Sequence, residues 1–372
     1  MRMAYLSTDP GVPYGGSKGA SVHVAQVVDA LAAEGHEILL LIAETLPGAD
    51  PPDGVILEVL PGFGKAMAVP ERLARQEELT EWLVRRLMIF APRALYERLA
   101  LYALAGSRAA RRMGIPHLVE LNAPLAEEAA RYRTLEDPVA ALDLEARALA
   151  AADLVLAVSS PLVDHARRRG ATRIEVFPNA ASVDLSALRG KPATPPVAVF
   201  AGSLRPWHGI ETIAAAWSLL GDGAPKLLVV GDGPARAVLD GIAAHVTGAV
   251  PRASVPALLA GAEIGLAPYG LDTPRYFSPI KLFEYLAAGL ATIVGDLPGV
   301  IGIVDSDSAR VIPAGDARAL AAAVSDLVRD PSERRRLGEN GLRLVAAHHT
   351  WRHRARRISE LIDGLVPSPV TV

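Results

Sequence analysis

The stretch YFSPIKLFEYLAAGLATIVGD, residues 276–296, predicts a loop, a helix with both ends marked, and then a buried strand. Ser278 is a favoured N-cap residue, and Pro279 suits the first helical position because its φ is fixed and it lacks an N–H donor. Gly289 is placed to end the helix in a left-handed turn. We therefore expect a helix over residues 279–288, followed directly by the strand.

One face of this predicted helix carries Lys281 and Glu284, which are three residues apart. Another face is apolar and consists of Leu282, Phe283, Leu286 and Ala287. The helix dipole disfavours a cation in the first turn, so a nearby anion such as a phosphate would explain the position of Lys281. The alternative is that Lys281 and Glu284 form an ordinary solvated ion pair.

The segment SPIKLFEYLAAGLATIVGD resembles the donor-binding signature of retaining glycosyltransferases of family four, which have the GT-B fold and use nucleotide sugars. The resemblance implies that Glu284 binds the ribose hydroxyls of the nucleotide. It also implies that the diphosphate and the sugar contact Ser278, Pro279 and Ile280. The first glutamate of the family's Glu-x7-Glu motif would fall at Tyr276, so its usual contact with the donor sugar is absent here or is made by other groups.

Length and composition set the outer bounds of the prediction. A chain of 372 residues, 51% of them apolar, favours two domains, each with its own core. A net charge of −3 gives no general attraction to nucleic acid, and the absence of cysteine excludes disulfides, thiolate metal sites and a cysteine nucleophile. No apolar run is long enough to span a membrane and the N-terminus lacks a signal-peptide pattern, so we expect a cytoplasmic protein.

The N-terminal domain, expected over residues 1–185, starts with a strand, a glycine-rich loop, a helix and a second strand. In the loop DPGVPYGGSKGAS we expect Gly15, Gly16 and Lys18 to approach a phosphate, since the family has such a loop near the diphosphate. The alternative is a purely structural turn. The loop lacks the Lys-Ser or Lys-Thr of a Walker motif, which argues against a P-loop.

Further along this domain, residues 70–114 predict long helices interrupted at Pro92, with arginine-containing faces that are either solvated or in contact with a membrane or acceptor. A strand over residues 116–121 follows. Glu120 and Asn122 lie at its carboxyl end, where parallel sheets place ligands, so both are candidates for the acceptor or sugar side. The alternative is that they only hold the next loop in place.

The second domain is expected over residues 186–350, after a linker over about residues 182–196, and residues 351–372 are expected to return to the first domain as a helix. In its first loop, GSLRPWHG, the family's phosphate-binding arginine and lysine would fall at Ser203 and His208. We expect Arg205, together with Lys281, to supply the missing positive charge, and His208 to contact the donor. The resemblance further implies donor contacts at Gly231, Val250 and Arg252.

No metal site is predicted. The sequence Asp305-Ser306-Asp307 has the Asp-x-Asp form, but it lies in a polar loop that favours a surface turn. The arginine runs at residues 167–169 and 334–336 lack interleaved aromatic residues, which argues against nucleic-acid binding. We expect no cofactor, the nucleoside diphosphate sugar being the donor substrate.

The resemblance therefore implies an α/β protein of the GT-B fold, with two doubly wound Rossmann-like domains facing each other across a cleft. The expected reaction is metal-independent, retaining transfer of a sugar, most simply from a UDP-sugar, to a hydroxyl of a small-molecule or lipid-linked acceptor. Arg205 and Lys281 would stabilise the departing diphosphate. The form SPxKLFEY is similar to that of bacterial enzymes that glycosylate small molecules, including those of aminoglycoside pathways.

Two alternatives remain open from the sequence. Nucleotide-sugar epimerases share the fold and many of these loops. A donor-binding partner subunit that has lost catalysis would explain Tyr276, Ser203 and His208 at motif positions.

Overall fold

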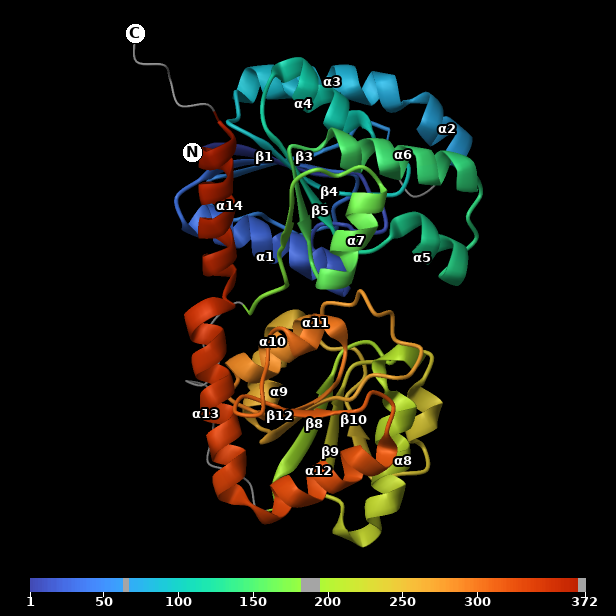
Figure 1. The fold of residues 1–372 in the computed structure, drawn as a ribbon, viewed down its shortest axis with the longest axis vertical. Coiled ribbons are helices and arrows are strands. Elements are labelled where there is room, and N and C mark those ends of the chain that lie inside the picture. The colour runs from blue at the N-terminus through green and yellow to red at the C-terminus, as the bar shows by residue number, and fades with distance from the viewer. Residues whose placement is uncertain (63–66, 182–194, 367–372) are drawn as a thin grey trace. The chain divides into compact units, whose positions relative to one another are not determined.

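The computed structural model describes residues 1–62, 67–181 and 195–366 of the chain (Figure 1). The chain divides into two compact units. Unit 1 comprises Met1–Pro178 and Trp351–Val372, and unit 2 comprises Asn179–Thr350. Apart from its last two residues, the predicted linker over residues 182–196 lies outside the described residues. No helix in the described ranges has the length and apolar character that a membrane span requires.

Unit 1 is built on a parallel sheet of seven strands in the order β3-β2-β1-β4-β5-β6-β7. The strands are β1 (Arg2–Ser7), β2 (Glu37–Ile42), β3 (Val55–Val59), β4 (Leu95–Arg98), β5 (His117–Leu121), β6 (Leu154–Ala157) and β7 (Ile174–Val176). Strands such as β2, EILLLI, are continuous apolar runs because both faces of a parallel sheet are covered. The strand order reverses between β1 and β4, which is where open sheets of this type place their ligands.

The helices of unit 1 lie on both sides of this sheet, with α3 and α4 on one side and α1 on the other (Figure 1). They are α1 (Gly19–Ala33), α2 (Val69–Ala74), α3 (Gln76–Phe90), α4 (Ala105–Met113), α5 (Leu125–Tyr132), α6 (Pro138–Ala151), α7 (Ser160–Arg168) and α14 (Trp351–Leu365). Helix α14 packs beside α1. Arg352 and Arg356 of α14 each donate to the carboxylate of Glu34, at 2.6 and 2.8 Å.

The prediction of helices throughout residues 70–114 is wrong at residues 95–98. Helix α3 ends at Phe90, followed by Ala91 in a left-handed conformation, and the chain then enters β4, LYER. Four residues with no clear period give no strand signal by themselves. They form a strand because β1 and β5 pair with them on either side, which is a tertiary effect. The short strand β3 and helix α5 were also not predicted.

Unit 2 has a parallel sheet of six strands in the order β10-β9-β8-β11-β12-β13. The strands are β8 (Val197–Ala201), β9 (Lys226–Val230), β10 (Ala244–Val246), β11 (Ile264–Ala267), β12 (Ala291–Gly295) and β13 (Arg310–Ile312). The helices are α8 (Ile210–Leu220), α9 (Val255–Ala260), α10 (Ile280–Ala287), α11 (Pro298–Ile301), α12 (Ala317–Arg329) and α13 (Pro331–His348). Here the order reverses between β8 and β11, so the loops after these strands are the expected ligand positions.

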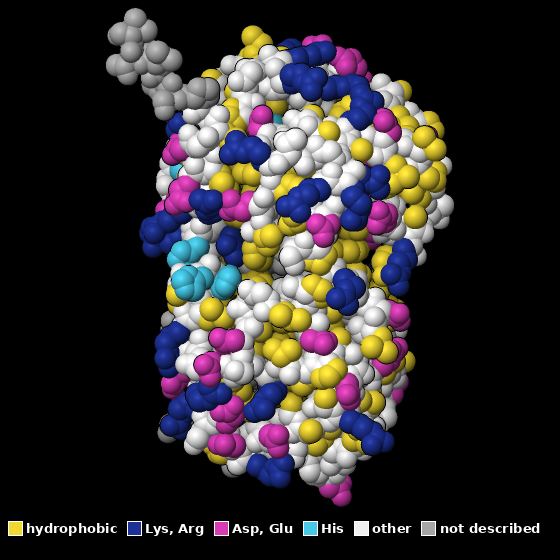
Figure 2. Space-filling view, viewed as in Figure 1, with side chains coloured by type: hydrophobic (Ala, Val, Ile, Leu, Met, Phe, Trp, Pro, Cys, Tyr) yellow, Lys and Arg dark blue, Asp and Glu magenta, His cyan; other side chains and the backbone are white. Residues whose placement is uncertain are grey.

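On the face shown in Figure 2, basic and acidic side chains are interspersed over both units. This distribution agrees with the net charge of −3, and the described side chains on this face form no single-sign patch of the kind that binds nucleic acid.

Candidate donor site

Helix α10, which the sequence marked out, begins one residue later than predicted. Pro279 is the N-cap residue and no side-chain cap bond is formed, so the prediction of Ser278 as the cap is wrong. Ser278 is instead held by Asn179, whose side-chain amide donates to the Ser278 carbonyl oxygen at 2.8 Å. The predicted left-handed ending is confirmed by Gly289, with φ of +67°. An uncapped first turn leaves the N–H groups of Ile280 and its neighbours available to an anion.

Lys281, in that first turn, is a buried cation without a hydrogen-bond partner. The residue is 8% exposed, and its Nζ has no partner among the described residues. The Nζ lies 3.9 Å from the ring centroid of Phe200 in β8 and 6.0 Å from that of Tyr269. Burial lowers the pKa of Lys281 to about 7, against a smaller opposite effect of Glu284. Aromatic faces satisfy an ammonium only in part, so this position favours a bound anion.

A glycine-containing loop lies next to Lys281, and a second such loop packs against the first. Gly202, at the end of β8, has φ of +137°, and a Cβ built on it would lie 3.3 Å from Lys281 Nζ. Gly231, at the end of β9, has φ of +140°, and a Cβ there would lie 2.1 Å from the Gly202 carbonyl oxygen. A side chain at Gly231 would therefore separate the two loops. The structure explains this glycine by packing, and its predicted contact with the donor stays a prediction.

His208, in the loop after β8, is a neutral ring. Its Nδ1 donates to the Ser203 carbonyl oxygen at 2.5 Å, and the ring packs against Phe277 with centroids 5.9 Å apart. Burial, and then the nearby charges of Lys281 and Arg205, lower the pKa of His208 to about 3, although the bond to Ser203 acts in the opposite sense. At neutral pH His208 thus cannot replace the cation that the family carries at this position.

Arg205 is the cationic side chain of this loop. It is exposed, and its guanidinium lies 5.8 Å from the ring centroid of Trp207. In the part of the chain that the structure describes, no carboxylate forms an ion pair with it. Because its guanidinium forms no such ion pair, Arg205 can bind a diphosphate without first breaking one.

Glu284 pairs with Arg252 rather than with Lys281. Arg252 Nη2 lies 2.5 Å from Glu284 Oε1, with the two side chains 43% and 13% exposed. The alternative prediction of a Lys281–Glu284 ion pair is therefore not what the structure shows. The residues are 32 positions apart in sequence, and nothing in the sequence indicated this contact.

Val250 lies just before Arg252 and packs against the apolar cluster that contains Val230 and Leu282. Gly231 and Gly248 form an isolated bridge, which joins the loop after β9 to the same segment. Unit 2 thus brings the predicted donor residues of three separate loops around the start of α10.

In unit 1, the predicted phosphate loop is also explained by close packing. Gly15 has φ of +81°, and a Cβ built on it would lie 2.3 Å from the Cβ of Ala49. A Cβ on Gly16 would lie 2.6 Å from Ser21 Oγ. Lys18 is exposed and is the N-cap residue of α1. The expected contact of these residues with phosphate remains a prediction.

Glu120, at the end of β5, is the centre of a buried hydrogen-bond network and is fully buried. Its Oε2 accepts from Tyr96 at 2.5 Å and lies 2.7 Å from His23 Nε2, while its Oε1 accepts from Arg98 at 2.9 Å and from Asn122 at 2.5 Å. Burial alone would raise the pKa of Glu120, but the contacts with His23, Arg98 and Asn122 outweigh burial and hold this pKa well below its usual range. The carboxylate is therefore already occupied, and Asn122 is held by it.

We expect Glu120→Gln to lower the free energy of unfolding by roughly 2 to 4 kcal/mol, because an amide N–H₂ would face donors that need an acceptor. Urea denaturation measures this change. Glu37→Gln is a matched control, since Glu37 is exposed and its ion pair with Arg2 is the only one it forms within the described part of the chain. Equal losses in the two variants would contradict a central role for Glu120. Because its pKa is lowered on folding, its contribution is present at neutral pH and is lost as the pH falls below the ordinary carboxyl range.

The Asp-x-Asp sequence forms a turn that is held by hydrogen bonds within it and by Arg336 of α13. Asp305 Oδ1 accepts from Ser308 Oγ at 2.8 Å and from the N–H of Asp307 at 3.1 Å, and Asp307 pairs with Arg336 at 2.8 Å. Over the described ranges, no three His, Asp or Glu side chains are grouped in a way that suits a metal ion.

Comparisons with known proteins match most of the chain. The family described as Glycosyltransferase Family 4 matches residues 17–185, and the family described as Glycosyl transferases group 1 matches residues 195–330. A GDP-mannose-dependent alpha-mannosyltransferase of Mycobacterium tuberculosis is 27% identical over 302 residues, which are 76% of each chain.

Solved structures agree with the fold. Sucrose-phosphate synthase from Thermosynechococcus elongatus has a TM-score of 0.74 at 19% identity, with 98% of each chain covered. Anabaena HepE in complex with UDP and glucose has a TM-score of 0.72 at 16% identity, covering 98% of this chain and 100% of its own. These likenesses and the two parallel sheets confirm the predicted GT-B class with two Rossmann-like domains.

Proposed function

The chain belongs to the glycosyltransferases of group 1 and family four, and from that premise we propose that it transfers a hexose, with retention, from a nucleoside diphosphate sugar to a hydroxyl acceptor. The observation that carries the proposal is the buried Nζ of Lys281, which has no hydrogen-bond partner in the described ranges and lies in the uncapped first turn of α10. A diphosphate would satisfy both the ammonium and the free N–H groups.

In this proposal, the glycosidic bond to the diphosphate breaks as an oxocarbenium-like sugar forms, and negative charge grows on the leaving phosphate. Lys281 and Arg205 stabilise that charge. Burial of Lys281 over Phe200 strengthens its interaction with an anion, because there is little water to screen it. The leaving phosphate oxygen takes the proton of the acceptor hydroxyl, so no side chain is needed as a general base.

Glu284 is proposed to accept hydrogen bonds from the ribose hydroxyls. It lies on α10 one turn beyond the phosphate-facing end, about where a ribose follows a diphosphate. Its partner in the structure is the guanidinium of Arg252, which lies at the end of a long side chain that is 43% exposed. Arg252 is thus free to leave Glu284, or to share it, when the nucleotide binds.

GDP-mannose is the first candidate for the donor, because the relative from Mycobacterium tuberculosis is a GDP-mannose-dependent enzyme. The UDP-sugar expected from the sequence is the second candidate. The acceptor is proposed to be a small-molecule or lipid-linked hydroxyl, and the enzyme is proposed to act in the cytoplasm, with peripheral membrane contact as an option.

The test is a transfer assay with the purified full chain. With GDP-mannose or a UDP-hexose and a panel of hydroxyl acceptors, we expect nucleoside diphosphate to be released only when donor and acceptor are both present. The rate should be the same with EDTA, since cationic side chains are proposed to hold the diphosphate. A product with inverted configuration, or turnover that EDTA stops and magnesium restores, would contradict the mechanism. Conversion of the donor without acceptor would instead indicate an epimerase.

A further inference from the structure

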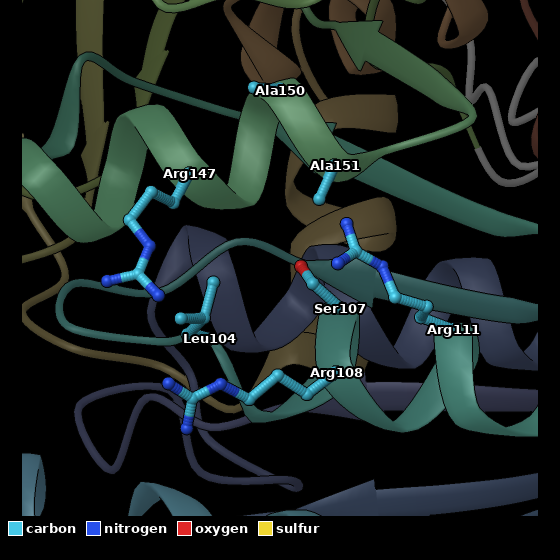
Figure 3. A pocket seen from close by; sticks show the side chains of 7 residues that line it. All are labelled: Leu104, Ser107, Arg108, Arg111, Arg147, Ala150 and Ala151. Carbon is cyan, nitrogen blue, oxygen red and sulfur yellow. The ribbon is translucent and has the colours of Figure 1, made fainter.

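A pocket of about 300 Å³ lies between α4 and α6 of unit 1 (Figure 3). Its wall consists of Leu104, Ser107, Arg108, Arg111, Arg147, Ala150 and Ala151. None of these residues belongs to the candidate donor site, and Arg108 and Arg111 lie in the segment over residues 70–114 whose arginines were predicted to be solvated or to contact a membrane or acceptor. The two alanines of α6 leave the space that larger side chains would fill.

The wall of this pocket carries three guanidinium groups and no carboxylate. Arg108 pairs with Glu77 of α3 and Arg147 pairs with Asp143 of its own helix, each at 3.2 Å. Arg111 is exposed, and no residue within the described ranges pairs with it. Two of the guanidinium groups are therefore partly neutralised from outside the pocket, and the third carries an uncompensated charge.

Ser107 adds a second, independent feature. The residue is 6% exposed, and its buried Oγ has no hydrogen-bond partner among the residues that the structure describes. Figure 3 shows the hydroxyl on the same side of the pocket as the Arg111 guanidinium and Ala151, while the guanidinium groups of Arg108 and Arg147 lie toward Leu104. A buried hydroxyl without a partner costs free energy, and a ligand in the pocket that supplies an acceptor would remove that cost.

We infer that this pocket binds a phosphate group carried by a small polar molecule or a lipid headgroup. A phosphate offers several acceptor oxygens, which suit a guanidinium fork at Arg111 and a hydroxyl donor at Ser107. The guanidinium groups of Arg108 and Arg147, at the other end of the pocket, also attract the negatively charged ligand. The volume accommodates a small phosphate ester, not a full nucleotide sugar.

The binding test uses glycerol 3-phosphate as the probe and titration calorimetry at low salt. All proteins carry Lys281→Met, so that the phosphate site of the donor does not contribute. We expect the affinity to fall about tenfold in Arg111→Gln and severalfold in Ser107→Ala, because each removes one contact to phosphate. Arg167→Gln is the matched control, since Arg167 is exposed on α7 and lies outside the pocket. Unchanged melting temperatures exclude a loss of fold.

A second measurement distinguishes a phosphate on a small molecule from a phosphate on a lipid headgroup. Sedimentation with phosphatidylcholine vesicles, with and without phosphatidic acid, shows whether a lipid-borne phosphate recruits the protein through Arg111. Recruitment that Arg111→Gln abolishes assigns the lipid headgroup, and calorimetric binding without recruitment assigns a free phosphate ester. The inference is overturned if the probe does not bind, or if Arg111→Gln and Arg167→Gln bind it equally well.

Discussion

Replacing Lys281 by methionine should lower kcat by about 10²- to 10³-fold, because it removes a preorganised cation from the leaving diphosphate. The ligand-free protein should nevertheless unfold at the same or a higher temperature. Lys281 Nζ is buried over Phe200, and no described residue forms a hydrogen bond with it, so methionine keeps the packing and removes an unsatisfied polar group. Loss of activity together with retained or increased stability is typical of a residue positioned for a ligand.

The pH dependence of stability provides a separate check on Lys281. Its pKa in the folded protein is about 7, below the ordinary value of 10.5. The unfolded state therefore binds more protons over this interval, and the free energy of unfolding rises as the pH increases. Urea denaturation at about pH 7 and at about pH 10.5 measures this effect. The free energy of unfolding should rise between the two pH values in the parent protein, and it should rise less in Lys281→Met.

Lys226→Met is the matched control, since Lys226 is an exposed lysine of the same unit. It should retain both turnover and the pH dependence of stability. A Lys281→Met variant that is strongly destabilised, or as active as Lys226→Met, would show that Lys281 is a structural residue.

Replacing Glu284 by glutamine should weaken donor binding by about tenfold to a hundredfold. A charge-assisted bond of a carboxylate is worth roughly 1.5 to 3 kcal/mol, and the amide can accept only with one of its two atoms. The melting temperature should change little, because the Arg252–Glu284 pair is partly exposed and such pairs contribute little to stability. Titration with the nucleoside diphosphate of the donor measures the affinity.

Arg252→Gln distinguishes the two roles of Glu284. It breaks the same ion pair and leaves the carboxylate in place. If Glu284 binds the ribose, Arg252→Gln retains donor affinity within a fewfold, while Glu284→Gln does not. If the two variants behave alike, Glu284 acts only as the partner of Arg252 and the proposed position of the ribose is wrong.

The sequence by itself determined the fold class and the elements that carry the candidate donor site. Helix α10 differs from the predicted helix by one residue at each end, and β12 is the strand that was predicted to follow it. These elements were predictable because buried parallel strands are continuous apolar runs, and because proline and glycine mark helix ends locally. In unit 1, β4 was not predicted, because it is a strand of four residues whose neighbours in the sheet come from distant parts of the chain.

Only the tertiary structure decided which side chains meet. Helical spacing suggested Lys281 as the partner of Glu284, but Arg252 forms that ion pair from 32 residues away. Glu120 was a candidate ligand contact by its place at the end of a strand, yet its carboxylate is taken by groups as distant as His23. Spacing along one helix or strand fixes which residues share a face. The contact that a charged group finally makes depends on which other chain segment brings the best-placed partner, and that is set by the packing of the sheet and its loops.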